Sequence, residues 1–293
     1  MPKRVVQKAA GRATRGAAAP MRAGARKAGK PRAAVARSET PRAGSRRAGS
    51  PRAATPGRAR AARGPVTLTV DIGGSGLKAA LLDSLGRMIT SRVRVATPVG
   101  QPPRAYLDAL AGLVAPLPSF QRISVGFPGV VRGPRVLTAP NLGHDGWRSF
   151  DLAGALTRRF GVPARLINDA EMQGLAVISG RGVEMVVTLG TGFGTALFED
   201  GRRSVHLEIS HHPFRKGQTY DQQLGNAARK RIGPARWNRR VQKAILNMQT
   251  LTLFDHLYVG GGNAEKLTIK LPENSSVVPN VMGVKGGVRL WDE

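Results

Sequence analysis

Val66-Thr-Leu-Thr-Val-Asp71-Ile-Gly73-Gly74-Ser75-Gly76-Leu-Lys78-Ala-Ala-Leu-Leu82 is the stretch that decides the fold of this chain. A β-branched apolar run enters a glycine turn and a second apolar run leaves it, which is typical of a β-hairpin with a tip free of bulky side chains. Ser84-Leu-Gly86 then opens a third run, from Met88 to Ala96. The stretch therefore predicts a three-strand meander.

The same pattern returns as Val186-Val-Thr-Leu-Gly190-Thr191-Gly192-Phe-Gly194-Thr195-Ala-Leu-Phe198, followed by the turn 199–201 and a third run at 204–208. Neither copy has the spacing of a dinucleotide-binding fingerprint or of a P-loop. Either turn alone is compatible with an ordinary hairpin. Because both share one frame, we expect two tips that face each other across a cleft, where backbone N–H groups of glycine turns bind phosphate.

Charge is spread unevenly along the 293 residues, whose formal net charge is +28. Residues 1–64 hold 18 Lys/Arg against one acid, Glu39, and no aromatic residue. Such a segment buries too little apolar surface to offset its ordering entropy, so we expect a disordered basic tail. It is similar to the tails of histone-H1-like bacterial proteins. The tail could bind nucleic acid or inorganic polyphosphate, or it could have no dedicated ligand. These alternatives stay open because binding driven by counterion release depends on charge alone.

The sequence has no cysteine, which excludes disulfides, thiolate catalysis and cysteine-based zinc sites and fits a reducing cytoplasm. No apolar run is long enough to span a membrane. The amino terminus lacks the apolar core of a secretory signal, and frequent Gly and Pro disfavour a mitochondrial transit helix. We therefore expect a cytoplasmic protein without a membrane partner.

The body of the chain alternates helix and strand patterns. Helical spacing at 102–117 and 150–160 flanks a strand pattern at 122–126, and another strand at 162–167 precedes a helix at 170–178. This alternation predicts an α/β fold, in which function gathers at strand ends. Asp169 lies at such an end, as a helix cap or as the carboxylate that accepts a hydroxyl proton in phosphoryl transfer. Asn168 beside it offers a donor and an acceptor for sugar-like hydroxyls.

Three later segments also carry candidate chemistry. His206-Leu-Glu208-Ile-Ser-His211-His212 admits a metal site built from His206, Glu208 and His211, polar ligand binding by Glu208 and His211, or a surface turn. Residues 227–248 have a basic face among apolar residues, so they form either a solvated amphipathic helical segment or a track for an extended polyanion. Gly260-Gly261-Gly262-Asn263 ends an apolar run and allows close approach of a flat or phosphorylated ligand.

With these motifs in order, residues 65–293 resemble the ROK family of sugar kinases, and within it the polyphosphate glucokinases. Asp71 to Gly76 matches the first phosphate motif and Leu189 to Gly194 the second. Asn168-Asp169-Ala170 matches the segment of the catalytic base, and Gly260 to Asn263 the adenosine motif. The resemblance implies an actin/hexokinase-like fold with a cleft between two lobes, a small domain at 65–175 and a large one at 176–293. It leaves open whether the last helix packs back on the small domain.

The resemblance also implies a role for each matching position. Asp169 is the implied general base; the implied sugar ligands are Asn168, Glu208, His211 and Asp221. The implied donor-phosphate contacts are Asp71, Gly73, Gly74, Ser75, Gly76, Gly190, Thr191 and Gly192, and the implied nucleotide or polyphosphate contacts are Gly260, Gly261, Gly262 and Asn263. Asp71 orients Mg²⁺ through water. Two positions depart from the family pattern: Ser210 replaces a glycine, and Asp221 replaces a glutamate.

The expected function is phosphoryl transfer from inorganic polyphosphate, or from ATP, to the 6-hydroxyl of glucose, by a homodimer. Two alternatives stay open at this stage. One is an ATP-dependent glucokinase or mannokinase of the same family. The other is a nucleic-acid-binding regulator on the same scaffold, although the tail has no apolar periodicity able to form a helix-turn-helix.

Overall fold

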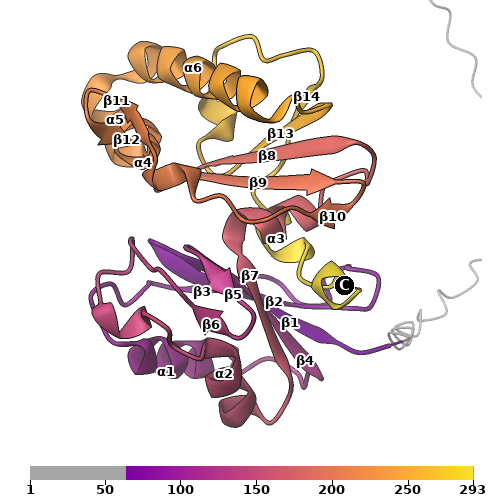
Figure 1. The fold of residues 1–293 in the computed structure, drawn as a ribbon. Coiled ribbons are helices and arrows are strands. Elements are labelled where there is room, and N and C mark those ends of the chain that lie inside the picture. Colours follow the sequence, from indigo (N-terminus) through magenta and orange to yellow (C-terminus); the bar gives the residue numbers. More distant parts are fainter. Residues whose placement is uncertain (1–63, 293) are drawn as a thin grey trace, which may run out of the picture. The chain divides into compact units, whose positions relative to one another are not determined.

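The computed structural model describes residues 64–292, which are organised around two five-stranded sheets (Figure 1). The strands of the first sheet fall between positions 67 and 168, and those of the second between 183 and 277. Strands and helices alternate along the chain, which confirms the α/β class. The predicted disordered tail lies outside the described residues, apart from its last glycine.

The first sheet has the strand order β3-β2-β1-β4-β7. Its members are β1 (Thr67–Gly73), β2 (Gly76–Leu82), β3 (Val93–Val95), β4 (Arg122–Phe127) and β7 (Ala164–Asn168). β1 pairs antiparallel with β2 through the predicted glycine hairpin and parallel with β4. The third strand is shorter than expected: residues 93–95 pair with β2, and Met88 makes a single bridge to Leu82. Residues between them are largely exposed, so no buried face holds them extended.

The second sheet has the order β10-β9-β8-β13-β14. Its members are β8 (Val183–Leu189), β9 (Phe193–Glu199), β10 (Arg202–Arg203), β13 (His256–Gly260) and β14 (Ser275–Val277). β8 and β9 form the second glycine hairpin, and β8 runs parallel to β13. The strand expected at 204–208 is wrong, because pairing with β9 ends at Arg203. The chain there leaves the sheet to bring His206 and Glu208 to a cavity.

Seven helices occur among the described residues: α1 (Pro103–Val114), α2 (Leu152–Phe160), α3 (Asp169–Leu175), α4 (Tyr220–Leu224), α5 (Asn226–Ile232), α6 (Pro234–Thr252) and α7 (Met282–Lys285). The segment 227–248, expected to be helical throughout, is divided between α5 and α6. Gly233, with a φ of +78°, separates them, and the missing N–H of Pro234 suits a helix start. No helix in residues 64–292 combines the length and apolar character that membrane crossing requires.

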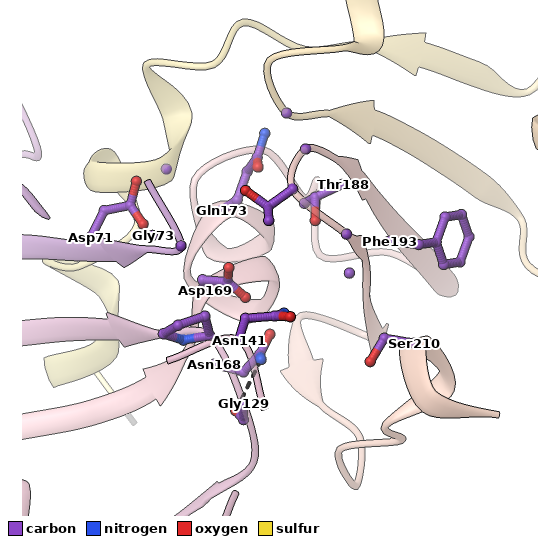
Figure 2. Close-up of a pocket in the computed structure, with 18 of the residues that line it drawn as sticks. Asp71, Gly73, Gly129, Asn141, Asn168, Asp169, Gln173, Thr188, Phe193 and Ser210 are labelled. Atoms are coloured by element: carbon purple, nitrogen blue, oxygen red, sulfur yellow. Dashed lines mark hydrogen bonds between the residues drawn. The ribbon is translucent and has the colours of Figure 1, made fainter. Parts of the chain in front are cut away.

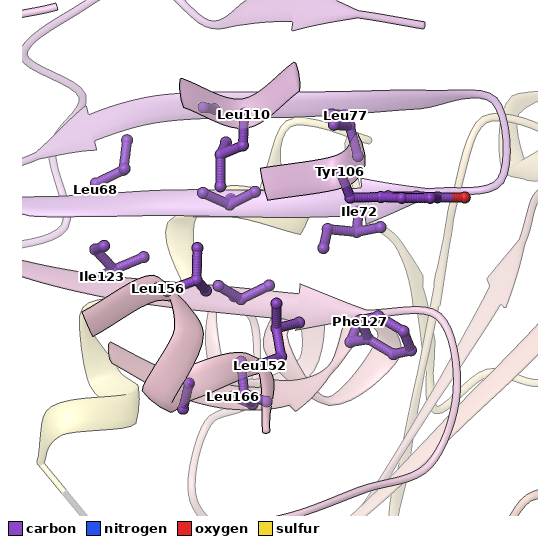
Figure 3. Close-up of a cluster of buried hydrophobic side chains, with 14 of the residues drawn as sticks. Leu68, Ile72, Leu77, Tyr106, Leu110, Ile123, Phe127, Leu152, Leu156 and Leu166 are labelled. Carbon is purple, nitrogen blue, oxygen red and sulfur yellow. The ribbon is translucent and has the colours of Figure 1, made fainter. Parts of the chain in front are cut away.

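Strand alternation explains which face each sheet buries. On β1, Leu68, Val70 and Ile72 pack against Tyr106 of α1 and Leu156 of α2 (Figure 3). The intervening polar residues of β1 point to the opposite face. The second sheet has its own core, in which Met185 and Val187 pack against Trp237 and Val241 of α6.

A third cluster joins the two sheets around α3. Met172 of α3 packs with Val186 of β8 and with Leu290, close to the end of the described chain. The segment after β14 therefore runs back along α3, where Ser124 Oγ of β4 donates a hydrogen bond to the carbonyl oxygen of Gly287 at 2.6 Å. Two segments, α3 and this carboxy-terminal one, thus pass between the sheets, and α3 begins at Asp169.

Candidate active site

A cavity of about 510 Å³ lies between the two glycine hairpins and the start of α3 (Figure 2). The predicted site residues that line it are Asp71, Gly73, Gly74, Ser75, Asn168, Asp169, Gly190, Thr191, Gly192, Glu208, His211, Asp221, Gly261 and Gly262. Gly76, Gly260 and Asn263 do not line it. The hairpin tips face each other, since a Cβ added to Gly74 would lie 3.3 Å from Cγ2 of Thr191.

Asp169 owes its position to a cap made by its neighbour. Asn168 Oδ1 accepts hydrogen bonds from the N–H groups of Ala170 at 2.9 Å and Glu171 at 3.3 Å, and Glu171 Oε2 accepts from the Asn168 N–H, which completes a capping box. The cap that the sequence allowed for Asp169 is therefore made by Asn168. Asp169 is the first helical residue, and its half-buried carboxylate opens on the cavity.

The environment of Asp169 favours its protonated form. Burial comes first, and the nearby carboxylates of Asp71, Glu208 and Asp221 add to it, so that the pKa of Asp169 rises to about 7 against the opposing hydrogen bond from the Ala170 N–H. A carboxyl with this pKa is divided between its two protonation states at neutral pH. This is the range in which a general base works best.

The amide of Asn168 is occupied by the backbone. While Oδ1 accepts the capping bonds, Nδ2 donates to the carbonyl oxygens of Gly129 at 3.1 Å and Phe127 at 3.4 Å. These bonds fasten the loop after β4 beside Asp169, and Figure 2 shows the bond to Gly129. The structure thus shows Asn168 as a residue that positions Asp169, and its contact with a sugar hydroxyl stays a prediction.

A chain of charged side chains connects α3 to the opposite wall of the cavity. Nδ1 of His206 lies 3.0 Å from Oε1 of Glu171, and Nε2 lies 3.5 Å from Oε2 of Glu208. Ser210 Oγ donates a hydrogen bond to Glu208 as well. Burial disfavours the charged form of His206, but the two carboxylates outweigh it and raise the pKa of His206 to about 9. Burial also disfavours the charged form of Glu208, but His206 and Ser210 hold the pKa of Glu208 below its ordinary value.

This pairing argues against the metal site considered for the histidine cluster. Both ring nitrogens of His206 face carboxylates, so the protonated ring has no lone pair for a metal ion. Within residues 64–292 no group of three or more His, Asp or Glu side chains is arranged so that it could hold a metal ion. Glu171, the partner of His206 in this arrangement, was not identified from the sequence, although its place three residues after Asn168 is the signature of a capping box.

His206 should make the stability of the protein depend on pH. Its folded-state pKa, about 9, lies above the ordinary value of 6.5, so its contribution is complete below pH 6.5 and is lost as the pH rises through 9. Relative to His206→Gln, we expect the wild type to lose roughly 2–3 kcal/mol of unfolding free energy between pH 6 and pH 10. Urea denaturation at both values measures this, and an equal loss in the two proteins would contradict it.

Asp221 lies beneath the second glycine turn. Its Oδ1 accepts a 2.6 Å hydrogen bond from the N–H of Phe193, and Asn141 Nδ2 lies 3.5 Å from its Oδ2. A Cβ on Gly192 would come within 2.4 Å of the same carboxylate. Burial raises the pKa of Asp221 above its ordinary value, while the two hydrogen bonds oppose the rise. Asn141, which lines the cavity, was not identified from the sequence.

The third glycine turn, residues 260–263, is hydrogen-bonded to the second glycine turn. Asn263 Nδ2 donates to the carbonyl oxygen of Gly190 at 3.2 Å, and the Asn263 N–H donates to that of Leu189 at 2.9 Å. Gly261 has a φ of +85°, and a Cβ there would lie 2.5 Å from the Leu189 carbonyl oxygen. In this structure Asn263 therefore fixes the second turn, while Gly261 and Gly262 reach the cavity.

Two further polar side chains, Lys78 and Gln173, line the cavity. Lys78 Nζ pairs with Asp71 Oδ2 at 2.7 Å, and its position opposite Asp71 follows from the hairpin register. Gln173, one turn after Asp169 on α3, is buried, and its Nε2 has no hydrogen-bond partner. Neither side chain was predicted as part of the site, although Lys78 could have been identified as the residue opposite Asp71 in the predicted hairpin.

Residues 67–214 match the model of the ROK family. The chain belongs to the ROK family. Among curated ROK-like relatives, the polyphosphate glucokinase of Mycobacterium tuberculosis (strain CDC 1551 / Oshkosh) is 26% identical over 233 residues, which cover 75% of this chain and 87% of that protein. The N-acetylmannosamine kinase of Escherichia coli (strain SE11) is 35% identical over 141 residues, covering 46% and 48%.

Solved structures of the ROK fold agree. The inorganic polyphosphate/ATP-glucomannokinase from Arthrobacter sp. strain KM superposes with a TM-score of 0.71 at 28% identity, covering 78% of this chain and 98% of that one. A ROK family glucokinase from Streptomyces griseus, in complex with glucose and AMPPNP, gives 0.64 at 20% identity, with 77% and 98% covered, and shows the shared fold alone. The actin/hexokinase-like fold expected from the motifs is thus confirmed.

Proposed function

We propose that this ROK protein transfers a phosphoryl group from inorganic polyphosphate, with ATP as a second donor, to the 6-hydroxyl of glucose. The observation that carries the proposal is the carboxyl of Asp169, poised near neutral pH at the start of α3 between two opposed glycine turns. The similarity to a polyphosphate glucokinase and to a polyphosphate/ATP-glucomannokinase supports the choice of donor and acceptor.

The two glycine turns hold the donor in this proposal. Backbone N–H groups at Gly73–Gly74 and Gly190–Gly192 bind the phosphates, because the missing Cβ atoms let the oxygens approach. Lys78 adds a cation at the same end. The cavity thereby concentrates positive potential where the transferred group carries negative charge.

Transfer then needs one proton acceptor. The ionised carboxylate of Asp169 takes the proton of the sugar 6-hydroxyl as that oxygen forms a bond to the terminal phosphorus. The bond from this phosphorus to the bridging oxygen of the donor breaks, and the shortened chain or ADP leaves with the electron pair. Closure of the cavity excludes water, which would otherwise accept the phosphoryl group.

The residues present fit a Mg²⁺ ion that keeps most of its water. One carboxylate, Asp71, faces the donor end of the cavity, and Mg²⁺ in phosphoryl-transfer sites is bound by one or two carboxylates together with substrate phosphates. When bound, the ion neutralises charge on the donor phosphates. Lys78, already paired with Asp71, holds that carboxylate in place.

The sugar end uses the remaining polar residues. Glu208, His211 and Asp221 line the cavity on the side of the second sheet and offer acceptors and donors for ring hydroxyls. The His206 pairing keeps Glu208 ionised, so that it accepts hydrogen bonds from hydroxyls throughout the neutral range.

The pH profile of the reaction follows from Asp169. Since the base must be ionised and its pKa is about 7, we expect kcat/KM for glucose to fall tenfold per pH unit below that value and to level off above it. Initial rates between pH 5.5 and 8.5 at saturating donor measure the profile. A flat profile down to pH 5.5 would mean that another group accepts the proton.

The direct test of the proposed function crosses donors with acceptors. Coupled assays with glucose and mannose, each against ATP and long-chain polyphosphate, give four values of kcat/KM. The proposal expects the largest value for glucose with polyphosphate. Turnover with ATP but not with polyphosphate would support the sugar-kinase activity and reject polyphosphate as the donor. No turnover in any of the four assays would reject the whole proposal.

A further inference from the structure

Arginines gather on the outer side of the second sheet, away from the lining of the cavity. We call Arg215 of β11 (Pro213–Arg215), Arg231 of α5, and Arg236 and Arg240 of α6 the arginine cluster. Between positions 213 and 252 the sequence holds nine basic residues and one acidic residue, Asp221, which faces the cavity. This segment therefore offers no carboxylate of its own to neutralise the cluster.

Arg215, Arg231 and Arg236 are close enough to Arg240 for their charges to act on it. Burial lowers the pKa of Arg240 first, and the charges of Arg215, Arg231 and Arg236 lower it further. Within residues 64–292 none of the four forms an ion pair with a carboxylate. Nη1 of Arg240 is buried without a hydrogen-bond partner, as is Nε of Arg229 nearby in the sequence.

A merely solvated basic face does not account for this arrangement. Solvated charges spread apart, whereas here one guanidinium is half-buried among three others. Such crowding is unfavourable by itself, and an anion on the exposed members would offset it. The fully buried nitrogens do not reach a ligand themselves; they show that the protein supplies no counter-charge.

The arginine cluster is connected to the donor end of the cavity. The N–H of Asn226, the first residue of α5, donates to the carbonyl oxygen of Gly190 at 3.0 Å. Arg231, in the same helix, lies with Nη2 3.5 Å from the carbonyl oxygen of Gln222, next to Asp221. α5 thus begins at the second glycine turn, on the wall of the cavity, and carries Arg231 of the cluster.

We propose that the arginine cluster binds the part of an inorganic polyphosphate chain that extends beyond the donor phosphates held in the cavity. The inference rests on the proposed function. Each guanidinium fork matches the oxygens of a phosphate, and neutralising several phosphates releases counterions, which makes the affinity strong and dependent on salt. Because the cluster is assigned to phosphates beyond those in the cavity, the proposal gives it a role with long donors and none with a nucleotide.

Chemical protection of arginines in the full-length protein tests the binding directly. An arginine-specific dicarbonyl reagent is applied with long-chain polyphosphate, with tripolyphosphate or with duplex DNA at equal phosphate concentration, and modification is mapped by mass spectrometry. We expect long-chain polyphosphate alone to slow modification of Arg231 and Arg236 severalfold. Because the readout is local, binding to the basic tail does not affect it. No protection, or equal protection by DNA, would overturn the proposal.

Turnover gives an independent measure. The triple variant Arg215→Gln, Arg231→Gln, Arg236→Gln should raise KM for long-chain polyphosphate about tenfold more than KM for tripolyphosphate, as expected for three exposed charge pairs. The matched control removes three exposed arginines elsewhere: Arg104→Gln, Arg148→Gln and Arg181→Gln. Equal effects of the two triples would refute the proposal. If the wild type uses ATP but no polyphosphate, the proposed donor fails, and the protection experiment alone decides the cluster.

Discussion

Asp169→Asn is expected to lower kcat by about three orders of magnitude or more while glucose still binds, because a positioned general base contributes about 10²–10⁴-fold to rate. The amide retains an acceptor for the Ala170 N–H, so the start of α3 should keep its shape. It lacks the basicity needed to take the proton of the sugar hydroxyl. Single-turnover assays measure the chemical step, and calorimetry measures the binding of glucose.

The same substitution should also stabilise the protein above neutral pH. In the folded protein the pKa of Asp169 is raised to about 7 from 3.8, so its ionisation destabilises the fold as the pH rises through 7. At pH 8 we expect Asp169→Asn to unfold with a free energy about 2–4 kcal/mol above that of the wild type. Asp145→Asn, at an exposed carboxylate, is the control for both measurements. Turnover within tenfold of wild type, or an unchanged stability, would contradict the role given to Asp169.

Gly261→Ala is expected to lower the free energy of unfolding by about 3 kcal/mol and to weaken donor binding. Its φ of +85° disfavours any side chain, and the added Cβ would lie 2.5 Å from the carbonyl oxygen and 2.7 Å from the nitrogen of Leu189. The backbone at Gly261 or at Leu189 must therefore shift. Because Leu189 leads into the second glycine turn, that turn is displaced as well. Chemical denaturation gives the stability change, and KM for the donor reports the displaced turn.

Gly262→Ala supplies the matched control for this prediction. The neighbouring glycine also lines the cavity, but its φ is ordinary and a Cβ there would meet no atom within 4 Å. Its unfolding free energy should stay within about 0.5 kcal/mol of the wild type. If both variants lose the same stability, the close contact between the third turn and the second does not determine the shape of the donor site.

The sequence predicted the fold where local pattern and tertiary structure agree. The two hairpins repeat an apolar run, a glycine turn and a second apolar run, and both appear as expected. The third strand of each meander depended on more distant packing. Residues 204–208 have a strand-like alternation, yet His206 pairs with the carboxylate of Glu171 on another element, which no local pattern reveals.

The candidate site was predicted in the same uneven way. Residues at strand ends and glycine turns, such as Asp169 and Gly190, follow from motifs within one segment and do line the cavity. The partner of His206 is Glu171, 35 positions earlier, and Asp221 meets Asn141 across 80 positions. Pairings of this kind arise when separate elements pack together, so a single sequence shows the residues but not the contacts.

The passage of two segments side by side between the sheets has a mechanical consequence. A pair of adjacent connections works as a hinge, because it lets one sheet rotate about the line of the connections and resists sliding. Asp169 begins one of these connections, so it lies close to the axis, where rotation displaces atoms least. Thr191 and Glu208 line the cavity on the side of the second sheet, which such a rotation moves. In the proposed function, a rotation of this kind moves the second glycine turn towards the substrates and displaces the Asp169 carboxylate little.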